Sequence, residues 1–272
     1  MFITYILITK LYLFMSKLTL KITQSKFTDF VSKLQDLAGI DDIIKIKIGN
    51  DHIMMYSMIS NESAVLALKN YVIPTNEYIE NFNQDETYDF IITSASKFVK
   101  NLKFFNTDVP IKLEFVSKPL PDNKEVMHVR SAQFSNGKLK ISCIGGEEFK
   151  IRDMNKSMLE SRLDSKNCRW VFKISQQDFS DVKKLCSINN EEKILNINVI
   201  NNSVTLSESS KWELEVDNID IKNVNLIFGK KYLSNINTND EFVNFSIFDT
   251  FILIKDINSD LLLSFEQSFD ED

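Results

Sequence analysis

The sequence predicts an α+β protein with two similar domains, each with two helices packed on antiparallel sheets. The first observation is a repeat: KITQSKFTDF at 21–30 and KISQQDFSDV at 173–182 lie 152 positions apart. The second is that many segments around them alternate apolar and polar residues, which is typical of half-buried strands. The third is that 272 residues include only 6 glycines and 4 prolines, which favours regular elements over loops.

The first copy opens with a strand and a helix. Apolar and polar residues alternate over 17–22, as in a strand with one buried face. Thr23 and Ser25 are candidate N-cap residues, and Gly39 is a candidate helix end. Between them, apolar residues recur at helical spacing: Phe27, Phe30, Val31, Leu34 and Leu37.

The remainder of the first domain continues with strands and one more helix. Two strand-like runs flank 49–51, which reads GND and predicts a hairpin, and a third run covers 63–73. The strand YDFIITS then leads into a helix predicted over Ser94–Asn106, with Phe98, Leu102 and Phe105 on one face. Three strands follow, at 110–117, 125–132 and 138–144, and Asn136-Gly137 joins the last two.

The second copy repeats this order. WVFKIS at 170–175 predicts a strand, and a helix with Phe179, Val182, Leu185 and Cys186 on one face follows it. A hairpin is expected over 193–209 with its turn at 201–202, followed by the strand KWELEVD at 211–217. VNLIF then leads into a helix over 229–236 and three strands at 242–248, 251–256 and 260–267. Each domain therefore holds two similar strand–helix–strands halves.

These patterns set the expected boundaries: an extension at 1–15, domain 1 at 16–144, a connector at 145–168 and domain 2 at 169–272. The segment MFITYILITKLYLF at 1–14 is apolar, but a bilayer span needs ~20 residues. It also lacks the basic region and small-residue cleavage site of a signal peptide. We expect an upstream start or a loosely attached extension rather than a membrane anchor.

Four segments carry a resemblance to a known family. They are the two repeats, SMISNESAVLAL at 57–68, and the closing strand with its acidic tail, LLLSFEQSFDED at 261–272. From 16 onward the chain resembles the sliding clamps, the DNA polymerase processivity factors represented by proliferating cell nuclear antigen and the phage clamps. The resemblance implies the DNA clamp fold. It also implies a homotrimeric ring, since two-domain clamps form three-subunit rings and three-domain clamps form two-subunit rings.

The resemblance also implies function and partners. The ring would encircle duplex DNA inside the cell at sites of replication, tether the replicative polymerase and be placed on DNA by a clamp loader, with no membrane partner. Polymerases insert a short apolar motif into a pocket of such clamps, and Met58 matches a pocket methionine. The other candidate pocket residues are apolar residues of the connector and the C-terminal strand: Phe149, Ile151, Met154, Met158, Leu159, Phe265 and Phe269.

Lysines on the predicted helices test this reading, because the chain as a whole is acidic, with a formal charge of −6. Lys97, Lys100 and Lys103 recur every third residue and form a stripe opposite the apolar face of their helix. We expect them to face DNA, although Asp29, Asp36 and Asp181 dilute the positive charge of the other helices. The other candidate DNA-facing residues are Lys26, Lys33, Lys183, Lys184, Lys230 and Lys231.

Catalytic, metal and cofactor sites are not predicted. The two histidines, His52 and His128, are far apart in sequence, and no zincin, phosphate-loop or nucleophile-elbow motif occurs. Three cysteines without a CxxC pair favour a reducing compartment over a disulfide framework or a zinc site. The sequence therefore predicts a protein that is not an enzyme and needs no cofactor.

Two other functions stay open. One is a monomeric clamp-like processivity factor, which would hold DNA by charge and should be more basic than this chain. The other is a duplicated β-rich assembly protein with no DNA role. For the ring, we expect edge strands such as KLKISCI and KWELEVD to pair between subunits, since an open edge exposes unpaired backbone groups.

Overall fold

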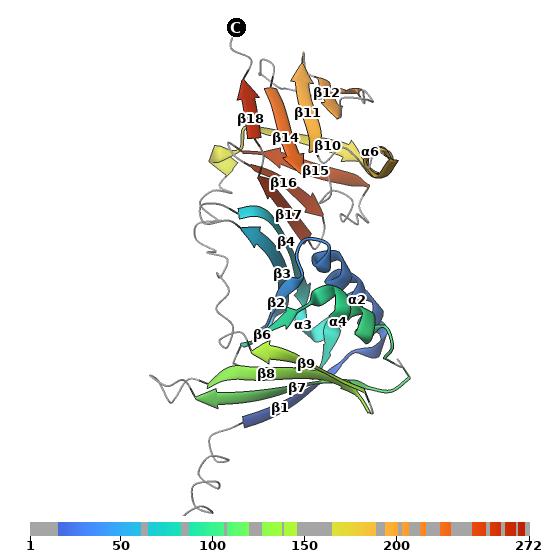
Figure 1. Cartoon of the computed structure of the whole chain (residues 1–272), viewed down its shortest axis with the longest axis vertical. Helices are drawn as coiled ribbons and strands as arrows, with labels where there is room; N and C mark the ends of the chain where they lie inside the picture. Colours follow the sequence, from blue (N-terminus) through green and yellow to red (C-terminus); the bar gives the residue numbers. More distant parts are fainter. Residues whose placement is uncertain are drawn as a thin grey trace, which may run out of the picture. The chain divides into compact units, whose positions relative to one another are not determined.

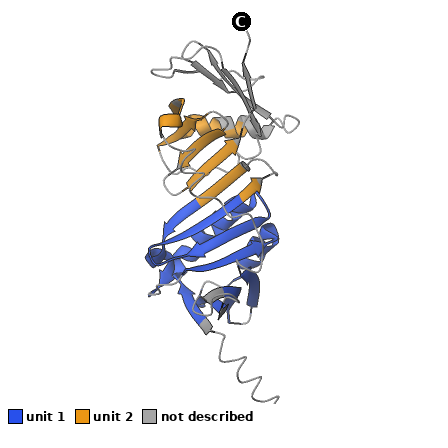
Figure 2. Cartoon of the chain, turned by 90° about the vertical axis from the view of Figure 1, so that its left-hand side faces the viewer, with its two compact units in different colours: residues 1–57, 71–152 blue, residues 58–70, 153–272 orange. Residues whose placement is uncertain are grey.

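The computed structural model describes 16–60, 65–82, 87–105, 108–119, 127–137, 139–145, 165–188, 194–200, 203–206, 213–215, 224–229, 241–248, 251–256, 259–264 and 266–269. The chain divides into two compact units (Figure 2). Unit 1 comprises Met1–Ser57 and Tyr71–Arg152, and unit 2 comprises Met58–Asn70 and Asp153–Asp272. The segment Met58–Asn70 thus belongs to unit 2 although the sequence places it in domain 1. The expected boundaries at 16–144 and 169–272 stay a prediction.

Unit 1 packs two neighbouring helices, α2 (Gln24–Ala38) and α4 (Ala95–Leu102), on an antiparallel sheet (Figure 1). The sheet order is β4-β3-β2-β6-β9-β8-β7-β1-β5. The remaining elements are, in chain order, β1 (Ser16–Ile22), β2 (Ile43–Ile48), β3 (His52–Ser60), β4 (Val65–Pro74), α3 (Thr75–Tyr78), β5 (Ile79–Glu80), β6 (Tyr88–Thr93), β7 (Ile111–Pro119), β8 (Met127–Asn136) and β9 (Leu139–Gly145).

Phenylalanine rings join both helices to the sheet. Phe134 of β8 lies under the helices, with its ring centroid 6.2 Å from that of Phe30 in α2 and 5.5 Å from that of Phe98 in α4. Phe27 of α2 stacks on Phe105, just beyond α4, at 6.1 Å. All five side chains are buried. The apolar stripe that the sequence predicts on each helix is therefore the face that packs on the sheet.

Two local expectations were wrong, and two short elements were not predicted. The helix predicted over Ser94–Asn106 ends at Leu102, because the N–H groups of Phe104 and Phe105 bond carbonyls three residues back and close tight turns. Ser25 lies inside α2, and Thr23 occupies the N-cap position without a side-chain hydrogen bond. The short elements α3 and β5 were missed.

The edge expected at KLKISCI is only partly open. Strand β9 pairs with β8 from Leu139 to Ile144, and on its other side with β6 at Ile144 and Gly145. Within the part of the chain that the structure describes, the edge of β9 that faces away from β8 has no strand partner over Leu139–Cys143. A Cβ on Gly145 would come within 1.8 Å of the Val129 carbonyl oxygen, so glycine permits this close approach.

Unit 2 holds η2 (Ser165–Asn167), α6 (Gln176–Ile188) and two groups of strands. The first group is β10 (Trp170–Ser175), β15 (Phe242–Ile247), β16 (Phe251–Asp256) and β17 (Ser259–Ser264), with β17 beside the part of β4 in this unit. The second is a five-stranded sheet in the order β13-β12-β11-β14-β18: β13 (Glu213–Glu215), β12 (Ser203–Leu206), β11 (Ile194–Ile200), β14 (Val224–Gly229) and β18 (Glu266–Phe269).

The repeated sequence forms the same structure twice. KITQSKFTDF runs from β1 into α2, and KISQQDFSDV from β10 into α6. Phe27 and Phe179 occupy matching helix positions and are both buried, and the ring of Phe179 meets Phe245 of β15 at 5.9 Å. The α+β, two-domain fold with antiparallel sheets is confirmed. The helix expected over 229–236 lies outside the described residues.

Candidate nucleic-acid interface

Helix α4 presents a lysine stripe to the outside of unit 1. Lys97, Lys100 and Lys103 are exposed, whereas Phe98 and Leu102 on the other face of the helix are buried. Lys103 Nζ donates to Gln35 Oε1 of α2 at 2.7 Å. Among the described residues, Lys97 and Lys100 form no ion pair. Two ammonium groups on α4 are therefore available for an anionic partner.

The start of α4 is fixed by Asp42 rather than by the residue that precedes the helix. Ser94 adopts a left-handed conformation, with φ 56°, and its side chain forms no cap. Instead Asp42 Oδ1 accepts the N–H of Ser96 at 2.8 Å, and the Asp42 carbonyl accepts that of Ala95 at 2.8 Å. This carboxylate lies at the end of the helix opposite Lys103, so it leaves the middle of the stripe uncompensated.

The outer face of α2 beside this stripe carries a row of uncharged polar residues. Ser25, Thr28, Ser32 and Gln35 are exposed and recur at intervals of three and four residues, so they share one side of the helix. Asp29 and Asp36 lie one turn from Ser25 and Ser32 on the adjoining flank of the helix. The Asp36 side chain is buried, whereas that of Asp29 is 44% exposed, so Asp29 keeps some negative charge near the open surface of α2.

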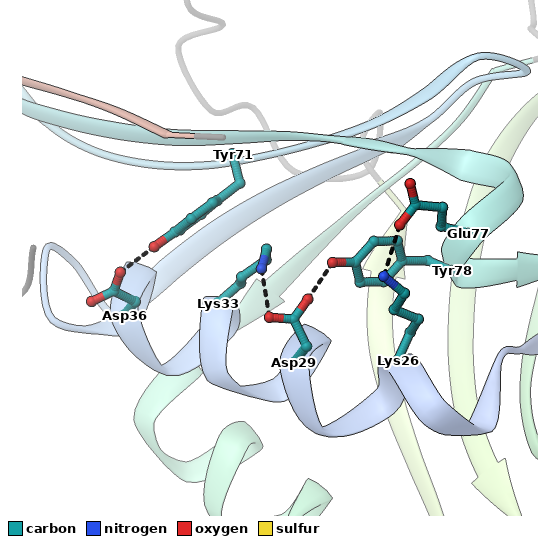
Figure 3. Close-up of polar contacts among 7 residues, drawn as sticks. All are labelled: Lys26, Asp29, Lys33, Asp36, Tyr71, Glu77 and Tyr78. Atoms are coloured by element: carbon teal, nitrogen blue, oxygen red, sulfur yellow. Dashed lines mark hydrogen bonds and ion pairs between the residues drawn. The ribbon is translucent and has the colours of Figure 1, made fainter. Parts of the chain in front are cut away.

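A polar cluster along the flank of α2 holds those acidic residues (Figure 3). Asp29 accepts a hydrogen bond from the Tyr78 hydroxyl of α3. It also accepts one from the Lys33 ammonium, at 2.6 Å. The hydroxyl of Tyr71 in β4 donates to Asp36. Lys26 pairs with Glu77 of α3 at 2.7 Å. These contacts tie one flank of α2 to β4 and α3, while the Lys103–Gln35 bond ties the other flank to α4.

The cluster stabilises its charged forms. Burial would raise the pKa of Asp29, but hydrogen bonds from Lys33 and Tyr78 outweigh it and lower the pKa. Burial and the Asp29 carboxylate raise the pKa of the Tyr78 hydroxyl. The hydrogen bond to Glu77 raises the pKa of Lys26. Lys26 and Lys33 thus lie next to carboxylates, apart from the stripe on α4.

In unit 2 the matching helix is arranged differently. Lys184 is exposed and pairs with Asp181 at 2.9 Å, and that hydrogen bond lowers the pKa of Asp181. Lys183 is half-buried. Asp178, which matches Lys26 in the repeat, caps the helix: its N–H donates to Ser175 Oγ at 3.1 Å, and that hydroxyl donates to its carboxylate at 2.5 Å. Lys230 and Lys231 lie outside the described residues.

Charge differs strongly between the units. Unit 1 contains 18 of the 32 basic and 16 of the 38 acidic residues, which leaves 14 basic and 22 acidic residues in unit 2. The formal charges are +2 and −8, which together give the −6 of the whole chain. Attraction of a polyanion is therefore concentrated on unit 1, where the lysine stripe lies.

The candidate partner pocket falls mostly outside the described residues. Met58 of β3 is half-buried. Phe149, Ile151, Met154, Met158 and Leu159 of the connector, and Phe265, lie in undescribed segments, and nothing is described of the side chain of Phe269 in β18. The pocket therefore stays a prediction.

Other sites are few in the described part. An open hollow of about 570 Å³ at the start of α2 is lined by Thr23, Gln24, Ser25, Thr28 and Glu80. No group of three or more histidine, cysteine or acidic side chains is placed to hold a metal among the described residues. None of the helices in that part is long and apolar enough to cross a membrane.

Known structures share this architecture. No protein-family model matches the chain, and no curated protein matches it in sequence. A chain of the PCNA2–PCNA3 complex from Sulfolobus tokodaii is similar at a TM-score of 0.58 and 11% identity, covering 92% of this chain and 99% of that one. PCNA from Thermococcus kodakaraensis is similar at a TM-score of 0.55 and 11% identity, covering 92% of this chain and 100% of that one. The Helicobacter pylori beta clamp bound to a DNA ligase peptide is similar at a TM-score of 0.60 and 13% identity, covering 91% of this chain and 65% of that one.

Identities of this size show the fold and no more. The chain has the sliding-clamp fold, and it spans the full length of the PCNA chains and about two thirds of the H. pylori beta clamp. The fold expected from the repeated segments is therefore confirmed. The lysine stripe on α4 and the row of uncharged polar residues on α2 are features of this chain within that fold.

Proposed function

We propose that the chain is a DNA polymerase processivity clamp that encircles duplex DNA as a ring. The observation that carries the proposal is its match to PCNA chains over 99–100% of their length. Exposed lysines on α4 support it, because phosphate contacts hold a duplex without reading its sequence. Such a protein holds its partners in place and performs no reaction of its own.

A homotrimer is the assembly that the chain length favours. Two-domain clamps resemble this chain from end to end, whereas it covers 65% of the H. pylori beta clamp. Among the described strands, β9 of unit 1 has a partly open edge and β13 ends the five-stranded sheet of unit 2. Both would supply backbone groups for strand pairing between copies. Three copies would then close a ring without a free edge.

Within this ring, Lys97, Lys100 and Lys103 are the main DNA contacts. Lys26, Lys33 and Lys184 contribute less, because each is paired with a carboxylate. Lys183, Lys230 and Lys231 are assigned to the same lining by the repeat. Contacts of this kind are weak and distributed, so the topology of the ring keeps it on DNA while it slides.

The partners are a polymerase and a clamp loader, at sites of replication inside the cell. The H. pylori clamp binds a DNA ligase peptide, which supports a peptide pocket in this chain as well. We assign that pocket to Met58, the apolar residues of the connector, Phe265 and Phe269. Methionine-rich surfaces adapt to several ligands, and a few buried anchors carry most of the affinity.

Retention on circular DNA tests the proposal. The full-length protein, loaded by its cognate loader on a nicked circle, should stay bound in high salt and leave when a restriction enzyme linearises the circle. A protein held by charge alone would leave both DNAs as salt rises. Equal salt-dependent loss from circle and linear DNA would rule out encirclement and favour the monomeric, charge-bound factor.

A further inference from the structure

The turn after α4 projects an aromatic ring into solvent. Phe104 is 79% exposed, more than any other large apolar side chain in the described part of the chain. Its neighbour Phe105 is 5% exposed and stacks on Phe27. The N–H groups of Phe104 and Phe105 bond the carbonyls of Asn101 and Leu102 at 3.1 and 3.0 Å. The backbone around Phe104 is therefore held by hydrogen bonds, and within the described residues its ring stacks on no other aromatic ring.

Exposed lysines precede this ring in the chain. Lys100 precedes Phe104 by four residues and Lys103 is adjacent, and both are exposed. At ~100° per residue, Lys97 and Lys100 lie along one side of α4, and Phe104 follows in the turn two residues after the helix ends. No acidic residue occurs in the sequence between Asp89 and Asp108. Phe104 thus follows the lysine stripe in a stretch of the chain that is basic and has no acidic residue.

We propose that Phe104 stacks on an unpaired base of single-stranded DNA while Lys100 contacts a neighbouring phosphate. The proposal rests on the proposed function, in which α4 lies along the DNA. Inside a duplex both faces of every base are covered by the neighbouring pairs, so a ring at the end of α4 can stack only where pairing stops. Aromatic stacking beside positive charge is the usual means of binding single strands without sequence preference.

This occupant fits better than an apolar protein surface. A docking site for protein is expected to have a core depleted of charge with a polar rim. Here the exposed ring comes one and four residues after exposed lysines, whose charges an apolar partner covering this turn would have to desolvate. A strand of nucleic acid offers both a flat apolar base and phosphates within one nucleotide, which matches one ring and the cations beside it.

The test is anisotropy of a fluorescein-labelled oligothymidylate with full-length protein at low salt, beside a labelled duplex. Phe104→Ala should weaken oligothymidylate binding about tenfold, which corresponds to ~1.4 kcal/mol, and leave duplex binding within about twofold. Phe104→Trp should keep the affinity, with its added fluorescence quenched on binding. Phe104→Leu should lose most of it, because leucine keeps apolar area without a flat ring. Phe242→Ala removes an exposed phenylalanine of β15 in unit 2 and should change nothing.

Three results would overturn the proposal: unchanged oligothymidylate affinity of Phe104→Ala, an equal loss on duplex, or a lower native mass of that variant, which would place the ring between copies. Failure of the proposed function looks different. A protein retained on circles whose single-strand binding ignores Phe104 refutes only the stacking contact. A protein lost from circles whose oligothymidylate binding still depends on Phe104 refutes only the ring.

Discussion

Tyr78 and Tyr71 bind the two carboxylates of α2, Asp29 and Asp36, along one flank of the helix. The hydroxyls of these tyrosines reach back to Asp29 and Asp36 from α3 and β4, 49 and 35 positions away in the chain. Sequence periodicity identified α2 and its buried face, but it could not show this pairing. Contacts across such separations depend on how β4 folds over the helix, and that information is not local.

Removal of the Tyr78 hydroxyl should weaken the cluster. Tyr78→Phe keeps the buried ring and deletes the donor to Asp29, a charged hydrogen bond of ~1.5–3 kcal/mol. Asp29 is ionised in the fold with a lowered pKa. Its stabilising contribution is therefore present above its ordinary pKa of 3.8 and is lost as pH falls through the lower pKa of the folded state. We expect a lower urea midpoint at pH 7 and little difference between variant and parent at the acid end.

The control for this prediction is a double-mutant cycle with Asp29→Asn. If the hydroxyl acts through Asp29, Tyr78→Phe should cost less in the Asp29→Asn background than in the parent. Equal costs in both backgrounds would show that Tyr78 stabilises the protein only through its ring and that the hydrogen bond contributes nothing measurable.

Cys143 should be chemically inert. It is buried in β9, and burial raises the pKa of its thiol above the ordinary value, so little thiolate forms at neutral pH. Cys168 is half-buried. With N-ethylmaleimide at pH 8, peptide mass spectrometry should find Cys168 modified well before Cys143. Equal rates in the native protein would mean that β9 opens easily, and urea-unfolded protein supplies the fully reactive reference.

At the level of elements, the sequence predicted the longer pieces and missed the short ones. Strands and α2 follow from periods of two and 3.6 residues over at least six positions. Helix α3 and strand β5 together cover only 75–80, too few residues for a period to show. The end of α4 was misplaced because Lys103 and Phe105 continue the amphipathic pattern after the helical hydrogen bonds stop.

The face of α4 gives a prediction at this scale. Changing Lys97, Lys100 and Lys103 to glutamate should preserve the fold, since all three are exposed. Duplex binding should weaken, and the slope of log affinity against log salt should fall by roughly 3 per subunit, at ~0.9 for each lost phosphate contact. The measurement is a salt titration of duplex anisotropy, together with primer extension on a long primed circle with the cognate polymerase.

A matched variant separates this site from general charge. Lys21, Lys112 and Lys173 are exposed on strands β1, β7 and β10, so their change to glutamate alters the net charge equally. That variant should retain most duplex affinity and the full salt slope. If both triple variants lose affinity alike, net charge governs binding and the α4 stripe has no special part in it.

For the whole molecule, the repeat in the sequence was enough to predict two domains of one architecture. It could not divide the chain as the structure does, because assigning Met58–Asn70 to unit 2 depends on packing beside β17 rather than on any local pattern. In unit 2 the Asn70 side-chain oxygen accepts the N–H of Asp260 at 3.1 Å. The β3–β4 hairpin begins in unit 1, and its segment Met58–Asn70 in unit 2 is bonded by a residue 190 positions later in the chain.

Ring closure through the edge of β9 can be tested with proline. Successive N–H groups of a strand point to opposite sides, so of Lys140→Pro and Ile141→Pro, one removes a donor to β8 and the other a donor on the open edge. The variant that loses the donor to β8 should have a lower melting temperature, since proline inside a paired ladder is costly. The variant that loses the donor on the open edge should fold normally, because proline is tolerated on an edge, yet it should fail to assemble. Light scattering after gel filtration should give about three times 31.5 kDa for the parent and the monomer mass for the edge variant. A trimer that survives both substitutions would show that the subunits meet elsewhere than at β9.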